Sequence, residues 1–222
     1  MAREQTMIFP RLNRWLNEKH GDFLRSHGVE PFDTRLYYGR DGLFTYHADA
    51  FRQKPPFLAA YQRGIAAGHG VDPQMEWRVH IALWAAKMAL RTSGDFVECG
   101  VNAGFVSSAI MHTLDWNRTG RQFYLVDTFA GPPLDQYSAE EIATGARAKA
   151  EHAISTGGYV TDFDRIRANY AEWQGVRVTP GRVPEVLSQV DTAQVAFLHI
   201  DMNSAAPERA ALEYFWPKLS HG

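Results

Sequence analysis

The chain has 222 residues, of which 45% are hydrophobic and 22% charged, and its formal net charge is −2. This length suits one α/β domain with an added segment, and the composition is that of a globular protein. The small net charge gives no electrostatic reason to expect nucleic acid or a membrane surface as a partner. No segment approaches the roughly 20 apolar residues of a membrane span, and the N-terminus lacks an apolar signal core. We therefore expect a cytoplasmic protein.

The N-terminal third is predicted to be helical or irregular. Apolar residues at helical spacing predict a helix over residues 8–24, and glycine and proline punctuation predicts irregular chain over 31–56. A longer helix is predicted over 73–91, with Asp72 as its N-cap. Its apolar face is expected to pack on a sheet, and nearby His80 is expected to be structural.

The segment from Gly94 to Phe105 is the most informative one. It consists of a turn, a short apolar strand and a glycine-bearing loop that opens a helix. Gly100 and Gly104 let a backbone approach a ligand closely, and the next strand ends in Asp127, placed to bind ribose hydroxyls. This order predicts a nucleotide-type site at the carboxyl ends of the strands in a doubly wound α/β domain.

The residues of this loop restrict the choice of nucleotide. Asn102 occupies the second glycine position of a dinucleotide fingerprint, and no Gly-Lys-Ser/Thr follows as in a P-loop. Glu98 at the strand end would repel phosphate but suits an amine-bearing ligand. S-adenosylmethionine, with its amino group, sulfonium and ribose, fits this pattern. The alternative is a strand-turn-helix in which the glycines only serve the turn. Cys99, the single cysteine, is expected to pack rather than react.

A long insertion follows Asp127. The pattern Ser138 to Glu141 is a capping box and predicts a helix over 139–153. Insertions at this point lie beside the ligand crevice, so the helix is either part of a lid, with a hinge at residues 157–158, or a solvated surface helix.

The remaining segments alternate between helix and strand, which predicts a mostly parallel, Rossmann-like sheet with helices on both faces. We expect a cap over 1–74 and an α/β domain over 75–222. The predicted segments are helices over 162–173, 183–190 and 207–219 and strands over 176–179 and 195–200.

Three motifs occur in order, and they carry a resemblance to a known family. They are Glu98-Cys99-Gly100-Val101, Asp127-Thr128-Phe129-Ala130-Gly131-Pro132 and His199-Ile200-Asp201-Met202-Asn203. With them, residues 75–222 resemble the TylF/MycF (macrocin) family of class I S-adenosylmethionine-dependent O-methyltransferases. The resemblance implies methyl transfer to a hydroxyl of a small molecule, such as a sugar or natural product, assisted by Mg²⁺.

The resemblance also implies roles for individual residues. The residues expected to bind the cofactor are Glu98, Gly100, Val101, Asn102, Gly104, Asp127, Thr128, Phe129 and Gly181. Asp201 is expected to be a metal ligand and, with Asn203, to take part in catalysis. Asn203 stands where the family often has a second acid suited to be the general base, and an amide cannot accept a proton at neutral pH. His199 is an alternative base, on the same side of its strand as Asp201.

The family continues after its last helix with a strand that ends in two aspartates, whereas this chain ends at Gly222. The class I strand order would leave 195–200 as an exposed apolar edge. We therefore expect either a fragment of a longer protein or an edge covered by another chain, and a homodimer is a further expectation. Two other readings of function remain open: a noncatalytic binding or assembly module, and another enzyme on this fold, such as an aminopropyl transferase or a nicotinamide oxidoreductase.

Overall fold

The computed structural model describes residues 38–45, 47–68 and 70–221. The predicted helix over 8–24 lies outside these residues. The chain divides into two units: residues up to Arg52 with Pro73–Met75, and residues 53–72 with everything from Glu76 onward. The predicted boundary at residue 74 therefore differs from the structural division. The reason is that helix α2 (Pro55–Ala67) packs against helix α4 of the second unit.

The described part of the first unit is a short hairpin rather than irregular chain. Strands β1 (Tyr38–Arg40) and β2 (Leu43–Thr45) pair antiparallel. Both residues of the connecting turn, Asp41 and Gly42, have positive φ, as two-residue hairpins favour. Within the same unit, the Tyr38 hydroxyl donates a hydrogen bond to the Gln74 carbonyl at 3.1 Å.

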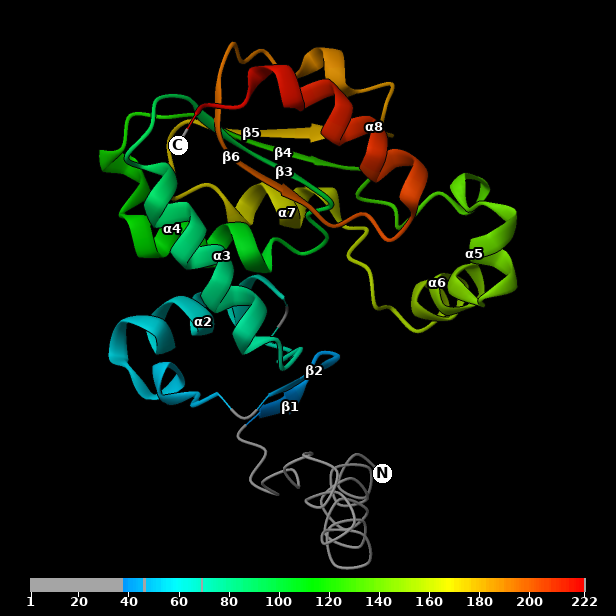
Figure 1. The fold of residues 1–222 in the computed structure, drawn as a ribbon, viewed down its shortest axis with the longest axis horizontal. Helices are drawn as coiled ribbons and strands as arrows, with labels where there is room; N and C mark the ends of the chain where they lie inside the picture. The colour runs from blue at the N-terminus through cyan, green and yellow to red at the C-terminus, as the bar shows by residue number, and fades with distance from the viewer. Residues whose placement is uncertain (1–37, 46, 69, 222) are drawn as a thin grey trace, which may run out of the picture. The chain divides into compact units, whose positions relative to one another are not determined.

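The second unit contains a parallel four-stranded sheet, which confirms the predicted fold class (Figure 1). The strand order is β5-β4-β3-β6, so the last strand lies beside the first, as expected for the class I order. The strands are β3 (Asp95–Cys99), β4 (Phe123–Asp127), β5 (Val176–Pro180) and β6 (Val195–Ile200). The burial of β4 on both faces explains why it is an almost continuous apolar run, whereas β3 buries the acidic side chain of Glu98 among apolar ones.

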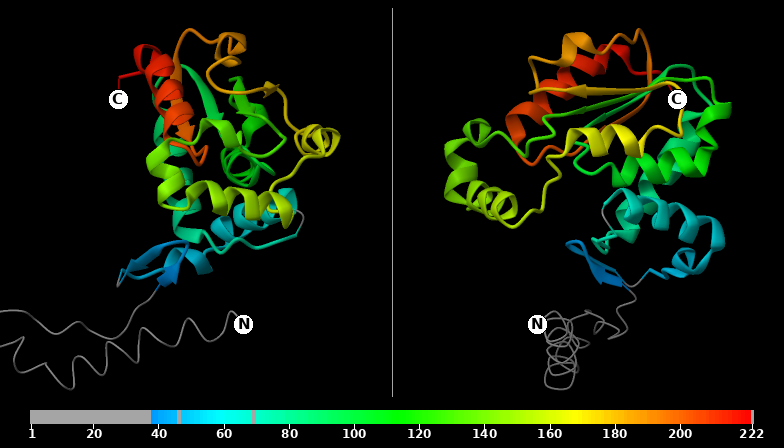
Figure 2. Two further views of the ribbon diagram at one scale, coloured as in Figure 1. Left: turned by 90° about the vertical axis from the view of Figure 1, so that its right-hand side faces the viewer. Right: turned by 180° about the vertical axis from the view of Figure 1, so that it is seen from behind.

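Helices cover both faces of this sheet (Figures 1 and 2). On one face, Val97 and Cys99 of β3 belong to a buried cluster with Phe215 of helix α8. On the other face, the rings of Phe96 and Trp116 have their centroids 5.2 Å apart. The helices of the second unit are α2, α3 (Glu76–Ala89), α4 (Phe105–Leu114), α5 (Ala139–Ala143), α6 (Ala146–Ser155), α7 (Phe163–Asn169) and α8 (Ala205–Phe215).

Two predicted helix boundaries are wrong for identifiable reasons. Helix α3 begins at Glu76 rather than at residue 73, and Asp72 does not cap it, because its carboxylate accepts a hydrogen bond from the Tyr61 hydroxyl at 2.7 Å. The predicted helix over 139–153 starts with the expected capping box but is divided into α5 and α6 at Gly145, whose φ is +81°.

The C-terminal half contains further differences. Helix α7 is shorter than the predicted 162–173, and the helix predicted over 183–190 is wrong, since only a 3-10 turn forms at Leu187–Gln189. Val183, Val186 and Val190 of that segment do repeat at helical spacing, and they are buried in the core although no longer helix forms. Helix α8 ends at Phe215 and a 3-10 turn, Trp216–Lys218, follows, because a proline inside it has no N–H to continue the helix.

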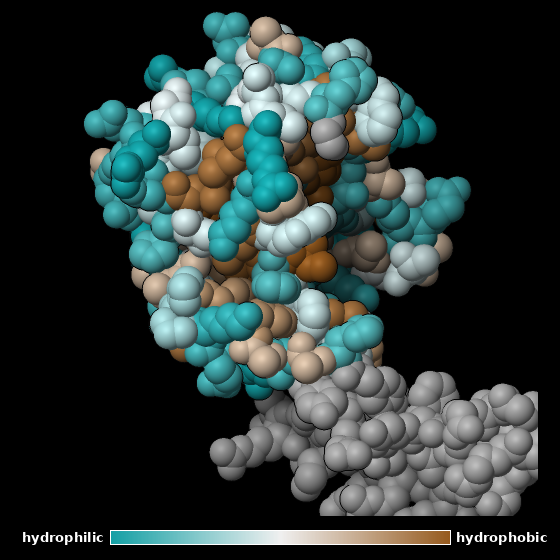
Figure 3. Space-filling model, turned by 60° about the vertical axis from the view of Figure 1, so that its left-hand side comes forward, coloured by the Kyte–Doolittle hydropathy of each residue, from teal (hydrophilic) through white to brown (hydrophobic). Residues whose placement is uncertain are grey.

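Strand β6 forms one edge of the sheet within residues 38–221. Leu219 makes an isolated parallel bridge to Val195, and the Ser220 N–H donates to the Val195 carbonyl at 2.8 Å. Beyond this point Leu198 and Ile200 are partly exposed, which agrees with the predicted apolar edge. Figure 3 shows one face of the molecule on which hydrophobic residues gather between hydrophilic ones.

The described helices include none that is both long and apolar enough to cross a lipid bilayer.

Candidate active site

The predicted site residues meet at the carboxyl ends of the strands. The Gly100 N–H donates to the Val126 carbonyl at 2.9 Å, and the Asp201 N–H donates to the Cys99 carbonyl at 2.8 Å. The loops that follow β3, β4 and β6 are therefore adjacent. Gly181 joins them through its N–H, which donates to the Asp127 carbonyl at 2.9 Å. This edge of a parallel sheet is where open α/β folds bind ligands.

The glycines of the first loop are required by neighbouring protein atoms. Gly100 has a φ of +89°, and a Cβ on it would overlap the backbone carbonyl of Asp201. Gly104 has a φ of +84°, and a Cβ there would overlap the Tyr170 hydroxyl. A Cβ on Gly181 would lie 2.8 Å from the side chain of Val186. Close approach of these glycines to a ligand remains a prediction, while their close approach to protein atoms is observed.

The Asp127 carboxylate holds two loops together. Its Oδ2 accepts from the backbone N–H groups of Val101 and Asn102, at 2.7 and 2.9 Å. Its Oδ1 accepts from the Phe129 N–H at 2.7 Å and lies 3.3 Å from the Thr128 hydroxyl, whose single proton has a nearer acceptor in the Gly131 carbonyl. Both oxygens of Asp127 therefore accept hydrogen bonds from the protein. The predicted role of this residue, binding ribose hydroxyls, did not include these bonds.

Thr128 and Phe129 shape the loop after β4. The Thr128 hydroxyl donates to the Gly131 carbonyl at 2.6 Å and accepts from the Ala130 N–H at 3.2 Å. Phe129 has a φ of +49° and is buried, with its ring 5.5 Å from that of Phe163. These residues border Asp127, as predicted, and fix the start of the insertion.

A buried carboxylate lies beneath the first loop. Glu98 is 2% exposed, and its Oε1 lies 2.9 Å from Nδ1 of His199. Its Oε2 is also buried and has no hydrogen-bond partner. Burial by itself lowers the pKa of His199, but the hydrogen bond and charge of Glu98, with a smaller contribution from Asp201, outweigh burial and raise that pKa. A buried oxygen without a hydrogen-bond partner is unusual in a folded protein, and a ligand that donates a hydrogen bond to Oε2 would satisfy it.

The two residues predicted to take part in catalysis, Asp201 and Asn203, directly follow β6. The Asp201 carboxylate forms an ion pair of 2.7 Å with Arg78 of α3, and both side chains are about half-exposed. Asn203 is exposed and has a φ of +67°. The His199 ring stacks on that of Phe197, with centroids 6.5 Å apart, and its position on the same side as Asp201 stays a prediction. Arg78 could not be predicted as a partner, because it lies far from Asp201 along the chain.

The described residues do not fit a magnesium site. Across residues 38–45, 47–68 and 70–221, no three His, Cys, Asp or Glu side chains are grouped so that they could hold a metal ion. Asp201, the predicted ligand, already has a guanidinium partner. Mg²⁺ prefers carboxylates that are free to bind it in octahedral geometry, and a single one is a poor site.

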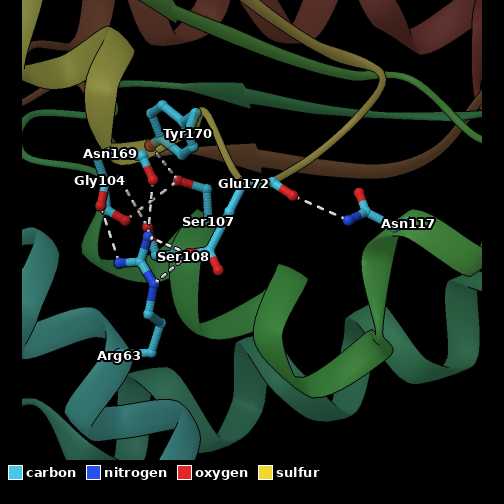
Figure 4. A network of polar contacts seen from close by, with 8 residues as sticks. All are labelled: Arg63, Gly104, Ser107, Ser108, Asn117, Asn169, Tyr170 and Glu172. Carbon is cyan, nitrogen blue, oxygen red and sulfur yellow. Dashed lines mark hydrogen bonds and ion pairs between the residues drawn. The ribbon is translucent and has the colours of Figure 1, made fainter.

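A polar network supports the first loop from outside (Figure 4). Arg63 of α2 donates to the Asn169 side chain at 2.9 Å and to its carbonyl at 2.8 Å. Asn169 in turn donates to the Ser108 hydroxyl at 2.9 Å. The Tyr170 and Ser107 hydroxyls are 2.8 Å apart, and burial raises the pKa of Tyr170. This network holds the end of α7 against the start of α4, next to Gly104.

Cys99 and His80, for which we expected structural roles, both lie in packed surroundings. Burial, with the charges of Glu98 and Asp127, raises the pKa of the Cys99 thiol to about 12, so the thiolate is strongly disfavoured. The ring of His80 makes edge contacts with Trp77 and Phe57, with centroids 5.6 and 6.2 Å away.

Comparisons with known proteins agree with this geometry. The methyltransferase domain family matches residues 97–222, and the chain belongs to this family. Among solved structures, the O-methyltransferase NovP superposes with a TM-score of 0.54 and 21% sequence identity, over 68% of this chain and 64% of NovP. This likeness shows a shared fold, and the matched part spans less than two thirds of NovP's length. No curated protein matches the chain.

Proposed function

We propose that the protein is an S-adenosylmethionine-dependent O-methyltransferase that acts on a hydroxyl of a small molecule, such as a sugar or natural product, as the TylF/MycF resemblance implies. The observation that carries the proposal is the buried, unpartnered Oε2 of Glu98 beneath the loop after β3. Membership of the methyltransferase domain family and the NovP-like fold support it.

The cofactor end of the site fits a cationic amino-acid ligand. Glu98 Oε2 can accept a hydrogen bond from an ammonium group, and a buried carboxylate favours a positive partner. The Thr128 hydroxyl lies 3.3 Å from Asp127 but has a nearer acceptor in the Gly131 carbonyl, so we assign this side of Oδ1 as the place where a ribose hydroxyl donates. When bound, the cofactor supplies an electrophilic sulfonium methyl group.

Asp201 and Asn203 remain our proposed acceptor-side residues. They follow β6, next to the loop after β3, where they can orient a hydroxyl toward the methyl group. We derive no step through Mg²⁺, because Arg78 occupies the Asp201 carboxylate. The hydroxylated acceptor, a homodimer, the lack of nucleic-acid or membrane partners and a cytoplasmic location stay predictions.

Isothermal titration with S-adenosylhomocysteine tests the cofactor assignment. We expect a dissociation constant on the order of micromolar, weakened at least about tenfold in Glu98→Gln, which keeps the shape but removes the charge. Glu140→Gln, on the exposed surface of α5, is the matched control and should bind as the wild type does. A folded wild-type chain that binds no S-adenosylhomocysteine would refute the proposal.

Methyl transfer distinguishes the alternatives. The chain is incubated with S-adenosylmethionine labelled in the methyl group and a panel of hydroxylated small molecules, and the label is followed into the acceptor. Cofactor binding without transfer to any acceptor would favour the noncatalytic module. Binding of NADH in place of S-adenosylhomocysteine would favour an oxidoreductase.

A further inference from the structure

The side chain of Asn102 clamps the insertion that follows β4. Its Nδ2 donates to the Gly158 carbonyl at 3.2 Å, and its Oδ1 accepts from the Val160 N–H at 2.9 Å. These two backbone groups flank Tyr159, so one amide fixes the peptide on both sides of that residue. The backbone N–H of Asn102 also donates to Asp127. Asn102 therefore joins the loop after β3 to the end of the insertion.

Tyr159 lies close to the ends of two strands. It is half-buried, and its ring borders Gly131, where an added Cβ would lie 3.8 Å from Cδ2 of the tyrosine. Burial raises the pKa of its phenol, and the negative charges of Asp127 and Asp201 add to this shift. Tyr159 thus lies between the loop after β3, to which Asn102 ties it, and the loop after β4 at Gly131.

The insertion has a second attachment at its other end. Oε1 of Glu141 accepts from the Ala205 N–H at the start of α8, at 2.8 Å, while its Oε2 accepts from the Ser138 N–H. These bonds lower the pKa of Glu141, so the carboxylate stays charged at neutral pH. The insertion is therefore held at two points by residues that adjoin the candidate site, and Tyr159 lies at the attachment made by Asn102.

We propose that Asn102 is a positioning residue that fixes Tyr159 as a wall of the candidate site, so that a ligand at the loop after β3 and the insertion stabilise each other. This inference rests on the proposed function, because the ligand is the cofactor assigned there. Coupling of this kind is reciprocal: the ligand protects the clamp, and loss of the clamp weakens the ligand.

Hydrogen exchange at the Val160 amide tests the clamp directly. The variant is Asn102→Gly, because glycine tolerates the φ of +48° that alanine would strain. We expect exchange at Val160 to be about tenfold faster in the variant than in the wild type without ligand. We expect S-adenosylhomocysteine to slow this exchange in the wild type but not in the variant, and to bind the variant about tenfold more weakly.

The chain contains a matched control for this experiment. Asn117 clamps Trp173 in the same way. Its Nδ2 donates to the Glu172 carbonyl at 2.9 Å (Figure 4). Its Oδ1 accepts from the Gln174 N–H at 2.7 Å. Asn117→Ala should accelerate exchange at Gln174 and leave exchange at Val160 unchanged. The change in exchange at Gln174 shows how much the loss of such an asparagine side chain loosens a loop outside the candidate site.

Two further variants separate positioning from a general structural role. Asn102→Asp keeps an oxygen for the Val160 N–H and should restore the protection that Asn102→Gly loses. Tyr159→Ala should weaken binding of S-adenosylhomocysteine while the exchange at Val160 stays slow. Equal exchange at Val160 in the wild type and in Asn102→Gly would overturn the inference whether or not the ligand binds. If S-adenosylhomocysteine binds no variant, the proposed function fails, and exchange in the free protein still decides the clamp.

Discussion

Nδ1 of His199 lies 2.9 Å from Oε1 of Glu98, and the carboxylate is almost completely buried. Burial of the imidazole lowers the pKa of His199, but the hydrogen bond and charge of Glu98 raise it by more, so its folded pKa is above the usual 6.5. A histidine with a raised folded pKa stabilises the protein fully below its unfolded pKa. This stabilisation is lost as the pH rises through the folded pKa.

Glu98→Gln should therefore lower the pKa of His199 and flatten the pH dependence of stability. In the wild type, we expect the free energy of unfolding to fall as the pH rises from about 6.5 through the raised pKa of His199. NMR titration of the His199 ring gives the pKa, and urea unfolding over the same range gives the stability. An unchanged His199 pKa in the variant would contradict this interpretation of the pair.

Arg78→Ala provides a control of opposite sign. The positive charge of Arg78 lowers the pKa of His199, so its removal should raise that pKa further. The effect on stability should be small, because the ion pair with Asp201 is half-exposed and such pairs contribute about 1 kcal/mol or less.

Asp127→Asn should destabilise the fold, because an amide nitrogen cannot accept the hydrogen bonds that one carboxylate oxygen accepts now. At least one backbone N–H would lose its acceptor in a partly buried position, at a cost of about 1–3 kcal/mol. Urea unfolding measures this change. Asp135→Asn removes an exposed carboxylate that pairs with Arg182, and it should leave the stability nearly unchanged.

Gly100→Ala should be among the most damaging single changes. Its Cβ would overlap the Asp201 carbonyl, a backbone atom that cannot move without displacing the end of β6. A loss above about 3 kcal/mol, or failure to fold, is the expected result. Gly120→Ala is the matched control: that glycine also has positive φ, but no atom lies near its added Cβ, so the cost should be about 1 kcal/mol. Thermal unfolding of both variants compares the two costs.

Arg121→Met should weaken the connection between α3 and β3. The guanidinium donates to four carbonyls at the end of the helix and in the following turn, those of Ala89, Leu90, Thr92 and Gly94. Methionine keeps much of the apolar contact but no donor, so we expect a loss of about 2–3 kcal/mol in urea unfolding. Arg118→Met, which removes only an exposed pair with Asp115, should have little effect.

The sheet could be predicted from the sequence because its strands leave a local signal. β3, β4 and β6 are short apolar runs, two of which end directly before or at an acid, and buried parallel strands have this pattern. Their parallel arrangement brings the loops after them together, so the location of the candidate site followed from topology alone.

The contacts within the site could not be predicted, because their partners come from distant segments. The family resemblance implies that Asp201 is a metal ligand, yet its carboxylate pairs with Arg78, which comes from α3. The position of Asp127 after β4 predicts a ribose contact, whereas its three backbone N–H donors are visible only in the fold. Asn102 stood out in the sequence merely as a missing glycine. The predicted start of α3 is wrong for a similar reason. The Asp72 side chain, which we expected to cap the helix, accepts a hydrogen bond from the Tyr61 hydroxyl instead.

The loop after β3 is already bonded in its folded form, since the Val101 and Asn102 N–H groups both donate to Asp127. A ligand that arrives there loses little free energy in ordering this loop. The insertion that carries Tyr159 is likewise bonded before a ligand arrives, through Asn102 and Glu141. Variants that loosen the insertion should act mainly on the rate of dissociation.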